Sequence, residues 1–288
     1  RTFNANPLRA ISLLQLFSEF AGQLNFHLEV HPALLHISSG NDSSPVAKLR
    51  QMLESLPAGL LHLEAGIQTL QQDVLDNCGR KGSCANSLEG LKFLVGCANF
   101  EVHADLIAGL PGYTFNSLVD DTLSLMAVSP AEIQLESLKL LPGTYFRNNA
   151  TELGIKYAPA PPYEVLSTPH ISYKELGRAM TLSKIIDLWY NDPKWKETFR
   201  EYMTYTKYIL HMSSVTGKKY GLPSLSPNNP MNGAIVLGIE ELFSNLLGIQ
   251  QLSVAMRRNP DAIEAFINRW DAERITPAIE KIKNGKGP

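Results

Sequence analysis

Apolar residues along the first 140 positions follow two alternating periods. Stretches in which every second residue is apolar predict half-buried strands, and stretches with a period near 3.6 predict helices. The strands are expected at 24–30, 60–66, 100–108 and 132–140, and the helices at 6–22, 46–56, 69–77, 87–97 and 115–128. Alternation of strands with helices favours a parallel sheet wrapped by helices. We therefore expect an α/β fold, namely a partial (β/α) barrel with parallel strands.

The pattern changes after residue 145. A proline-rich stretch with few periodic apolar residues, 145–170, predicts a connection over the surface. Helical periodicity returns at 173–190, 193–212, 237–257 and 260–283, with a loop at 217–233. The aromatic residues of the first two of these helices are typical of core positions. The sequence thus predicts a barrel at 1–145, a connecting segment with a helical extension at 146–204, and a mainly α-helical C-terminal region at 205–288.

Composition narrows the classes of partner. A formal net charge of -2, without any block of like charges, argues against nucleic acid. No apolar run approaches the roughly 20 residues that span a bilayer, and the first residues lack a signal-peptide pattern. We expect a cytoplasmic protein with no membrane contact. The chain begins at an Arg within what reads as a strand exit, which is typical of a trimmed or partial chain.

Three cysteines, Cys78, Cys84 and Cys97, are an odd number at spacings that fit neither a disulfide framework nor a CxxC pair. They are expected to be free thiols. The P-loop and dinucleotide fingerprints are both absent from the sequence, and so are the GxSxG elbow, the HExxH motif and a Cys/His array with zinc spacing. The absence of the P-loop and dinucleotide fingerprints argues against a nucleotide held by a Gly-rich phosphate cradle.

Candidate chemistry lies where the predicted strands end, which is where barrels hold their ligands. Glu29 and His31 flank Val30, so on a strand they point to the same side and could share one ligand. Gln68 follows the second strand and offers both a donor and an acceptor. His31 as a solvent-facing residue and Gln68 as an amide that ties down a loop are equally open interpretations.

Asp105 lies within an otherwise apolar strand, where an unpaired carboxylate would cost several kcal/mol, so it needs a partner. Gly109, with Pro111 and Gly112, permits a tight turn and a close approach of the backbone to a ligand. Any strand-to-helix turn can use such a sequence, so this signal alone is weak.

Several of these segments, taken in order, resemble the radical S-adenosylmethionine superfamily. The resemblance rests on LEVHP (28–32), GIQT (66–69), Arg80 twelve residues after Gln68, DLIAGLPG (105–112), LKLLPGT (138–144) and PPYEVLSTPHISYKEL (161–176). The similar branch contains coproporphyrinogen dehydrogenase-like enzymes and cobalamin-binding, magnesium-protoporphyrin ester cyclase-like enzymes. The resemblance covers about residues 1–200.

The resemblance implies a partial six-fold (β/α) barrel that holds S-adenosylmethionine against a 4Fe-4S cluster and cleaves it reductively to a 5′-deoxyadenosyl radical. It implies that Glu29 contacts the methionine amino group or the ribose, Gln68 the ribose, Arg80 the carboxylate and Asp105 the ribose hydroxyls. Gly109 and Leu140 complete the implied cofactor-binding set. Arg suits bidentate carboxylate recognition, although Arg80 could equally be a simple charge in the GRKG loop. Cobalamin is a possible further cofactor.

The family's CxxxCxxC cluster loop is absent from this sequence, and three thiolates are needed to hold such a cluster. The first strand, the cluster loop and any cobalamin domain are therefore expected upstream of residue 1. The tail, about 205–288, resembles the uroporphyrinogen decarboxylase superfamily through a GIEELF…NP..I pattern. No metal ligand and no catalytic residue is assigned.

Three functions remain open on this basis. The first is part of a radical S-adenosylmethionine enzyme, an oxidoreductase or methyltransferase acting on a small tetrapyrrole-like or lipid-like substrate. The second is a non-catalytic binding or scaffold module without a cluster. The third is a uroporphyrinogen decarboxylase-like corrinoid methyl-transfer protein. An open partial barrel exposes strand edges, which favours a homodimer or a partner domain that covers them.

Overall fold

The computed structural model describes residues 2–37, 43–80, 82–193 and 196. The described residues fall almost entirely in one compact unit, Arg1–Asp192. Its main elements are α1 (Pro7–Ser18), β1 (Phe26–Val30), α2 (Pro45–Ser55), β2 (Leu61–Gln68), α3 (Gln72–Asn77), α4 (Cys84–Gly96), β3 (Glu101–Ala108), α5 (Phe115–Val128), β4 (Glu132–Ser137) and α7 (Tyr173–Ile185). Short elements complete the unit: η1 (Phe3–Ala5), η2 (Pro32–Leu35), α6 (Tyr145–Asn148), β5 (Lys156–Tyr157), β6 (Val165–Ser167) and η3 (Ile186–Tyr190), a π-helix.

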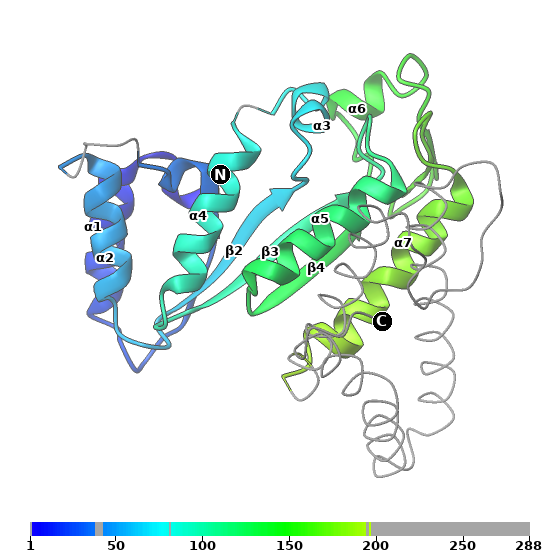
Figure 1. Cartoon of the computed structure of the whole chain (residues 1–288). Coiled ribbons are helices and arrows are strands. Elements are labelled where there is room, and N and C mark those ends of the chain that lie inside the picture. Colours follow the sequence, from blue (N-terminus) through cyan, green and yellow to red (C-terminus); the bar gives the residue numbers. More distant parts are fainter. Residues whose placement is uncertain (1, 38–42, 81, 194–195, 197–288) are drawn as a thin grey trace, which may run out of the picture. The chain divides into compact units, whose positions relative to one another are not determined.

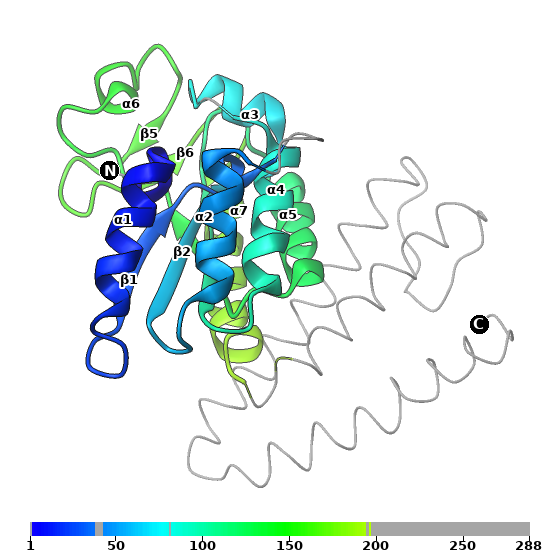
Figure 2. The ribbon, with the colours of Figure 1, turned by 90° about the vertical axis from the view of Figure 1, so that its left-hand side faces the viewer.

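The four long strands form one parallel sheet in the order β1-β2-β3-β4. Helices α4 and α5 lie side by side on one face of this sheet, and α7 packs beside β4 (Figures 1 and 2). This confirms the expected α/β fold with parallel strands alternating with helices, and the open sheet forms a partial barrel. Within the described part of the chain, no helix is long and apolar enough to cross a membrane.

The two faces of the sheet differ in chemistry because each strand alternates apolar and polar residues. The helix-covered face is apolar except for Ser137 and carries the core, including Leu63, Ala104, Leu106 and Ile133, each at 0% exposure. The opposite face carries histidines, carboxylates and one amide. A parallel sheet covered by helices on both faces reads as nearly continuous apolar runs, so this alternation identifies a sheet with one polar face.

Local sequence signals explain where the helices begin. Asn6 accepts a hydrogen bond from the backbone N–H of Arg9, and Pro7 occupies the first helical position of α1. Thr114 caps α5 by accepting from the backbone N–H of Ser117. Ser172 and Glu175 form a reciprocal capping box at the start of α7.

Several predicted bounds are corrected by the structure. The first helix ends at Ser18 rather than Gly22, and the second strand extends past 66 to Gln68. The fourth strand ends at Ser137 rather than at 140, because the following backbone turns to form an antiparallel bridge between Lys139 and Glu164.

The predicted surface connection at 145–170 contains α6 and the two-stranded antiparallel sheet of β5 and β6. The predicted loop at 217–233 and the helices at 237–257 and 260–283 lie outside the described residues, as does nearly all of the one at 193–212. The domain boundaries at 145 and 204 stay predictions.

Candidate functional site

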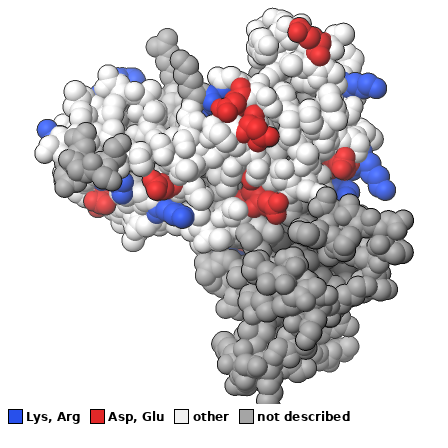
Figure 3. All heavy atoms as spheres, turned by 45° about the horizontal axis from the view of Figure 1, so that its top comes forward, with Lys and Arg blue, Asp and Glu red and all other residues white. Residues whose placement is uncertain are grey.

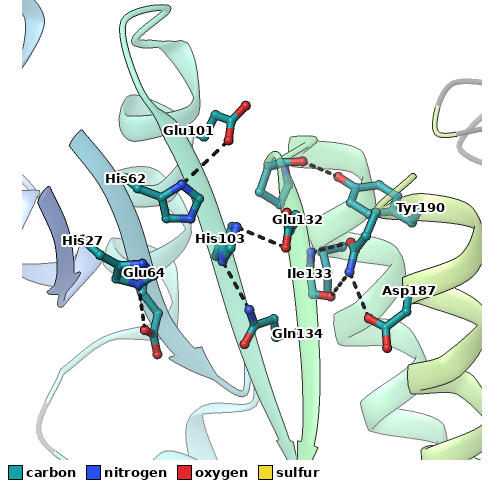
Figure 4. Close-up of polar contacts among 12 residues, drawn as sticks. His27, His62, Glu64, Glu101, His103, Glu132, Ile133, Gln134, Asp187 and Tyr190 are labelled. Atoms are coloured by element: carbon teal, nitrogen blue, oxygen red, sulfur yellow. Dashed lines mark hydrogen bonds and ion pairs between the residues drawn. The ribbon is translucent and has the colours of Figure 1, made fainter. Parts of the chain in front are cut away.

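The polar face of the sheet carries a row of three imidazoles near the strand starts, from His27, His62 and His103. The ring centroids of His27 and His62 are 4.8 Å apart, and those of His62 and His103 are 4.1 Å apart (Figure 4). Burial, followed by the neighbouring His103 and His27, lowers the pKa of His62. The charged form of its imidazole is therefore disfavoured, as expected for a partly buried ring beside two other imidazoles.

Each imidazole of this row also has a carboxylate beside it. The nitrogen-to-oxygen distances are 3.2 Å from His27 to Glu64, 3.7 Å from His62 to Glu101 and 3.1 Å from His103 to Glu132. Gln134 lies 3.2 Å from the other ring nitrogen of His103. Figure 4 shows these contacts running across the sheet from β1 to β4. The row is thus a layer of imidazoles that each lie beside a carboxylate, although His103 Nε2 makes no hydrogen bond within the described part of the chain.

A carboxyl-rich layer follows nearer to the strand ends. Glu29 pairs in register with Glu64, and Asp105 pairs with Gln134. Burial raises the pKa of Asp105 to about 8, with further contributions from the charge of Glu64, a hydrogen bond to Glu64, and the charges of Glu29 and Glu136. The pKa of Asp105 is thus raised toward neutral pH, and Glu64 is the neighbour that contributes most after burial. This is the partner that the sequence argument required.

One oxygen of Asp105 has further hydrogen-bonding capacity. Its Oδ1 is buried and, among the described residues, has no hydrogen-bond partner. A buried polar atom of this kind costs free energy unless a water or a ligand satisfies it. A hydroxyl group is one donor whose chemistry fits this oxygen.

Arg80 and Gln68 lie at the exit of β2. The Nη2 of Arg80 donates to the carbonyl oxygen of Gly66 at 3.1 Å, and the guanidinium is half-buried. Burial lowers the pKa of Arg80, and the nearby Glu29 acts against this lowering. Gln68 ends the strand at an irregular register with a left-handed φ of 66°, a conformation that costs a non-glycine residue free energy.

The structure thus gathers Glu29, Gly66, Arg80 and Asp105 around the ends of β1 to β3. Gly109 (φ 91°) directly follows the last residue of β3, and a Cβ placed there would contact the side chains of Val165 and Leu176. Leu140 is fully buried, and its backbone carbonyl accepts from Arg147 Nη1 at 2.9 Å.

His31 makes a two-way backbone contact with a buried asparagine at the exit of β1. Its N–H donates to Asn4 Oδ1 at 2.9 Å, and its carbonyl accepts from Asn4 Nδ2 at 3.0 Å. Asn4 is 2% exposed. The N-terminal segment thereby fixes the backbone that follows Glu29.

Sequence reasoning missed Asp121, a buried carboxylate on α5. It accepts hydrogen bonds from the segment after β2 and from Tyr113 after β3. The only local signal was a second acid, next to Asp120, in an otherwise apolar helix pattern. Its partners lie 8 to 52 residues away in the sequence, so no spacing rule points to them.

The three cysteines do not fit a cluster. Cys84 and Cys97 lie at opposite ends of α4, which its 13 residues make about 20 Å long. Burial raises the pKa of each of the three thiols to about 11, whereas cluster ligation requires thiolates. Within the described ranges no group of three or more His, Cys, Asp or Glu could hold a metal ion. A 4Fe-4S cluster would need ligands other than these cysteines.

Charged side chains of both signs lie at the strand-exit end of the sheet. In Figure 3, which brings that end forward, the Lys and Arg side chains of the described residues lie apart from one another and form no continuous basic patch. Acidic side chains lie between them.

The chain matches a family model described as "Protein of unknown function (DUF4080)" over residues 151–210. A curated relative, the heme chaperone HemW of Haemophilus influenzae, is 26% identical over 140 residues, which are 48% of this chain and 34% of HemW.

Among solved structures, the radical S-adenosylmethionine methyltransferase TsrM from Kitasatospora setae, with cobalamin and a [4Fe-4S] cluster bound, is similar with a TM-score of 0.43. It is 15% identical, and the match covers 62% of this chain and 36% of TsrM. Coproporphyrinogen III oxidase (HemN) from Escherichia coli, a radical SAM enzyme by its description, has a TM-score of 0.37 at 18% identity over 48% of this chain and 30% of HemN. The chain spans about a third of the length of these relatives.

Proposed function

We propose that this chain is part of a radical S-adenosylmethionine enzyme and binds S-adenosylmethionine at the C-terminal ends of β1 to β3. The observation that carries the proposal is the convergence of Glu29, Gly66, Arg80 and Asp105 at that end of the sheet. These residues belong to three segments, far apart in sequence, whose order resembles the superfamily.

Each residue has a role that its surroundings support. The Arg80 guanidinium carries five donors, of which one goes to the Gly66 carbonyl, so the others suit the ligand carboxylate. Glu29, exposed on β1, suits the ligand amino group. Asp105 offers to a ribose hydroxyl an oxygen that has no hydrogen-bond partner among the described residues. Gln68 is the predicted second contact to the ribose.

A reduced cluster would supply the electron that cleaves S-adenosylmethionine. The described residues would bind and orient the S-adenosylmethionine. No residue of this chain is assigned to the cluster, and cobalamin, with no residue assigned to it either, belongs to the proposal only as a possible cofactor. The proposal includes both reaction types, oxidation of the substrate and methylation of the substrate.

The substrate classes suggested by the resemblance differ in charge. The four long strands contain no Lys or Arg, whereas their polar face carries Glu29, Glu64, Asp105 and Glu136. A tetrapyrrole with several carboxylates would therefore need cationic partners from other elements. A lipid-like substrate makes no such demand on the sheet.

A binding module without catalysis is the second candidate. The raised pKa values of the three thiols favour it, because these cysteines then supply no cluster ligands within the described chain. In either case, the open edge of β1, which pairs only with β2 in the described sheet, is the proposed docking edge for a second copy or a partner domain.

Calorimetric titration with S-adenosylmethionine tests the proposal. Asp105→Ala and Gln68→Ala should each weaken binding by about 1–3 kcal/mol, the usual cost of an unpaired buried polar partner. Glu101→Gln is the matched control, because Glu101 is the first residue of the strand that carries Asp105. It therefore lies at the end of the strand opposite to the proposed site. Wild-type protein without measurable binding would refute the proposal, and affinities unchanged by both alanine variants would remove these residues from the site.

The full gene product, reconstituted without oxygen, separates the two candidates. An enzyme should show the absorbance of a 4Fe-4S cluster and release 5′-deoxyadenosine when a reductant is added. A protein that binds S-adenosylmethionine but shows neither signal is the binding module.

A further inference from the structure

Asp121 is a carboxylate that the fold buries and surrounds with four hydrogen-bond donors. Its side chain is 1% exposed. Oδ2 accepts from Thr69 Oγ1 at 2.9 Å, from the Leu70 backbone N–H at 2.7 Å and from the Tyr113 hydroxyl at 2.6 Å, while Oδ1 accepts from Gln71 Nε2 at 2.6 Å. Among the described residues no Lys, Arg or His forms a salt bridge with it. Neutral donors alone therefore offset the cost of burying this charge.

The four donors come from two different strand exits. Thr69, Leu70 and Gln71 follow directly after β2, and Tyr113 follows the Gly109–Gly112 turn after β3. The carboxylate itself belongs to α5, a helix on the apolar side of the sheet. One side chain therefore ties both exits to one support.

Both exits contain a residue with a positive φ, but only the one at Gln68 is costly, because glycine adopts such angles freely. Gln68, immediately before Thr69, has a φ of 66°, and Gly112, immediately before Tyr113, has a φ of 87°. A non-glycine residue in this region costs about 1–3 kcal/mol and persists only when its surroundings over-determine it. The residues adjoining both positions donate hydrogen bonds to Asp121.

We propose that Asp121 is a positioning residue that couples the exits of β2 and β3 and so holds Gln68 in its ligand-binding conformation. It acts through Thr69 and Tyr113 and touches no ligand itself. The inference rests on the proposed function for the identity of the ligand, but the coupling of the two exits stands on its own contacts.

Hydrogen exchange at the Leu70 amide measures the coupling between the exits of β2 and β3, because this N–H donates to Asp121. We would measure it on the full chain, relative to the Leu63 amide in the centre of β2, so that global unfolding cancels. Tyr113→Phe removes only the donor from the β3 exit. It should nevertheless speed exchange at Leu70, on the β2 exit, by about tenfold, which corresponds to about 1.4 kcal/mol.

Tyr190→Phe is the matched control. Tyr190 is also fully buried and also donates one hydroxyl hydrogen bond, to the Pro130 carbonyl at 2.8 Å, but away from both exits. It should leave exchange at Leu70 unchanged. Asp121→Asn preserves the shape and one acceptor oxygen, so its effect should fall between those of wild type and Asp121→Ala.

Binding is measured in parallel by titration with S-adenosylmethionine. The proposal expects Tyr113→Phe to weaken binding by about three- to tenfold and Tyr190→Phe to leave it unchanged, in line with the loss of one hydrogen bond. Exchange at Leu70 that is unaffected by Tyr113→Phe, or equally affected by Tyr190→Phe, overturns the coupling. Faster exchange with unchanged affinity overturns the positioning role. If wild-type protein binds no S-adenosylmethionine, the proposed function and the positioning of its ligand both fail, while the exchange data still decide the coupling.

Discussion

Replacing Asp105 by asparagine should make the protein more stable at alkaline pH and flatten its stability profile. The pKa of Asp105 is raised to about 8, mainly by burial and then by Glu64, whereas an unfolded chain ionises this carboxyl near pH 4. Because the folded pKa is the higher one, the folded state binds the proton more tightly. The stability contributed by the protonated carboxyl is complete below about pH 4 and is lost as the pH rises to about 8.

The size of this stability loss follows from the pKa values of Asp105 in the folded and unfolded states. The difference between the two pKa values corresponds to about 5 kcal/mol as an upper bound, at about 1.4 kcal/mol per pH unit. The side chain is only partly buried, so solvent reduces this figure, and we expect a loss of about 2–3 kcal/mol between pH 5 and pH 8. Asparagine is neutral throughout and can still donate to Glu64, so Asp105→Asn should escape this loss.

Urea denaturation followed by circular dichroism, at intervals from pH 4.5 to 8.5, measures the effect. Wild type and Asp105→Asn should have similar free energies of unfolding at the acid end and should diverge as the pH rises. Glu152→Gln, which removes an exposed carboxylate, is the control and should track the wild type. A difference between wild type and Asp105→Asn that is constant across the pH range would refute the reasoning.

Three further substitutions test the fold by urea denaturation. Gly90→Ala should cost about 3 kcal/mol or more, because its Cβ would overlap the backbone carbonyl of Pro32, whereas Gly96→Ala on the same helix meets open space and should stay within about 0.5 kcal/mol. Ser172→Ala should cost about 1 kcal/mol by removing the capping box of α7. Arg147→Ala should cost about 1–2 kcal/mol, because its guanidinium stacks on two tyrosine rings and donates to a buried carbonyl. Equal losses from the two glycine variants, or no loss from either of the others, would contradict these contacts.

The sequence predicted the order of elements well because most of them carry their own periodicity. The helix at 115–128 was predicted with the bounds of α5, since both Thr114 and the apolar spacing are local signals. Strand ends were predicted less well, because they depend on distant partners. β4 ends early since the backbone after it turns toward Glu164, which no pattern within 132–140 reveals.

In the candidate site too, local signals could be predicted from the sequence and contacts with distant residues could not. Asp105 could be singled out because a carboxylate in an apolar strand breaks a local rule, and the inference that it needs a partner was sound. That this partner is another carboxyl, Glu64, could not be read, because it depends on the register between β2 and β3. Asp121 was not predicted as a functional residue, because an acid on a helix is usually exposed. Its burial and its hydrogen-bond donors are visible only in the structure.

Two costly features lie at the same end of this sheet, and the packing of the core requires neither. A left-handed glutamine ends β2, and on the neighbouring strand an aspartate with a raised pKa has one buried oxygen that no described residue hydrogen-bonds. Features that break local rules are expected where binding or catalysis imposes its own demands. Asp121 ties the exits of both strands to α5, so the helix-covered side of the sheet supports these costly positions. This combination of costly positions and a supporting helix is what a preformed ligand site requires.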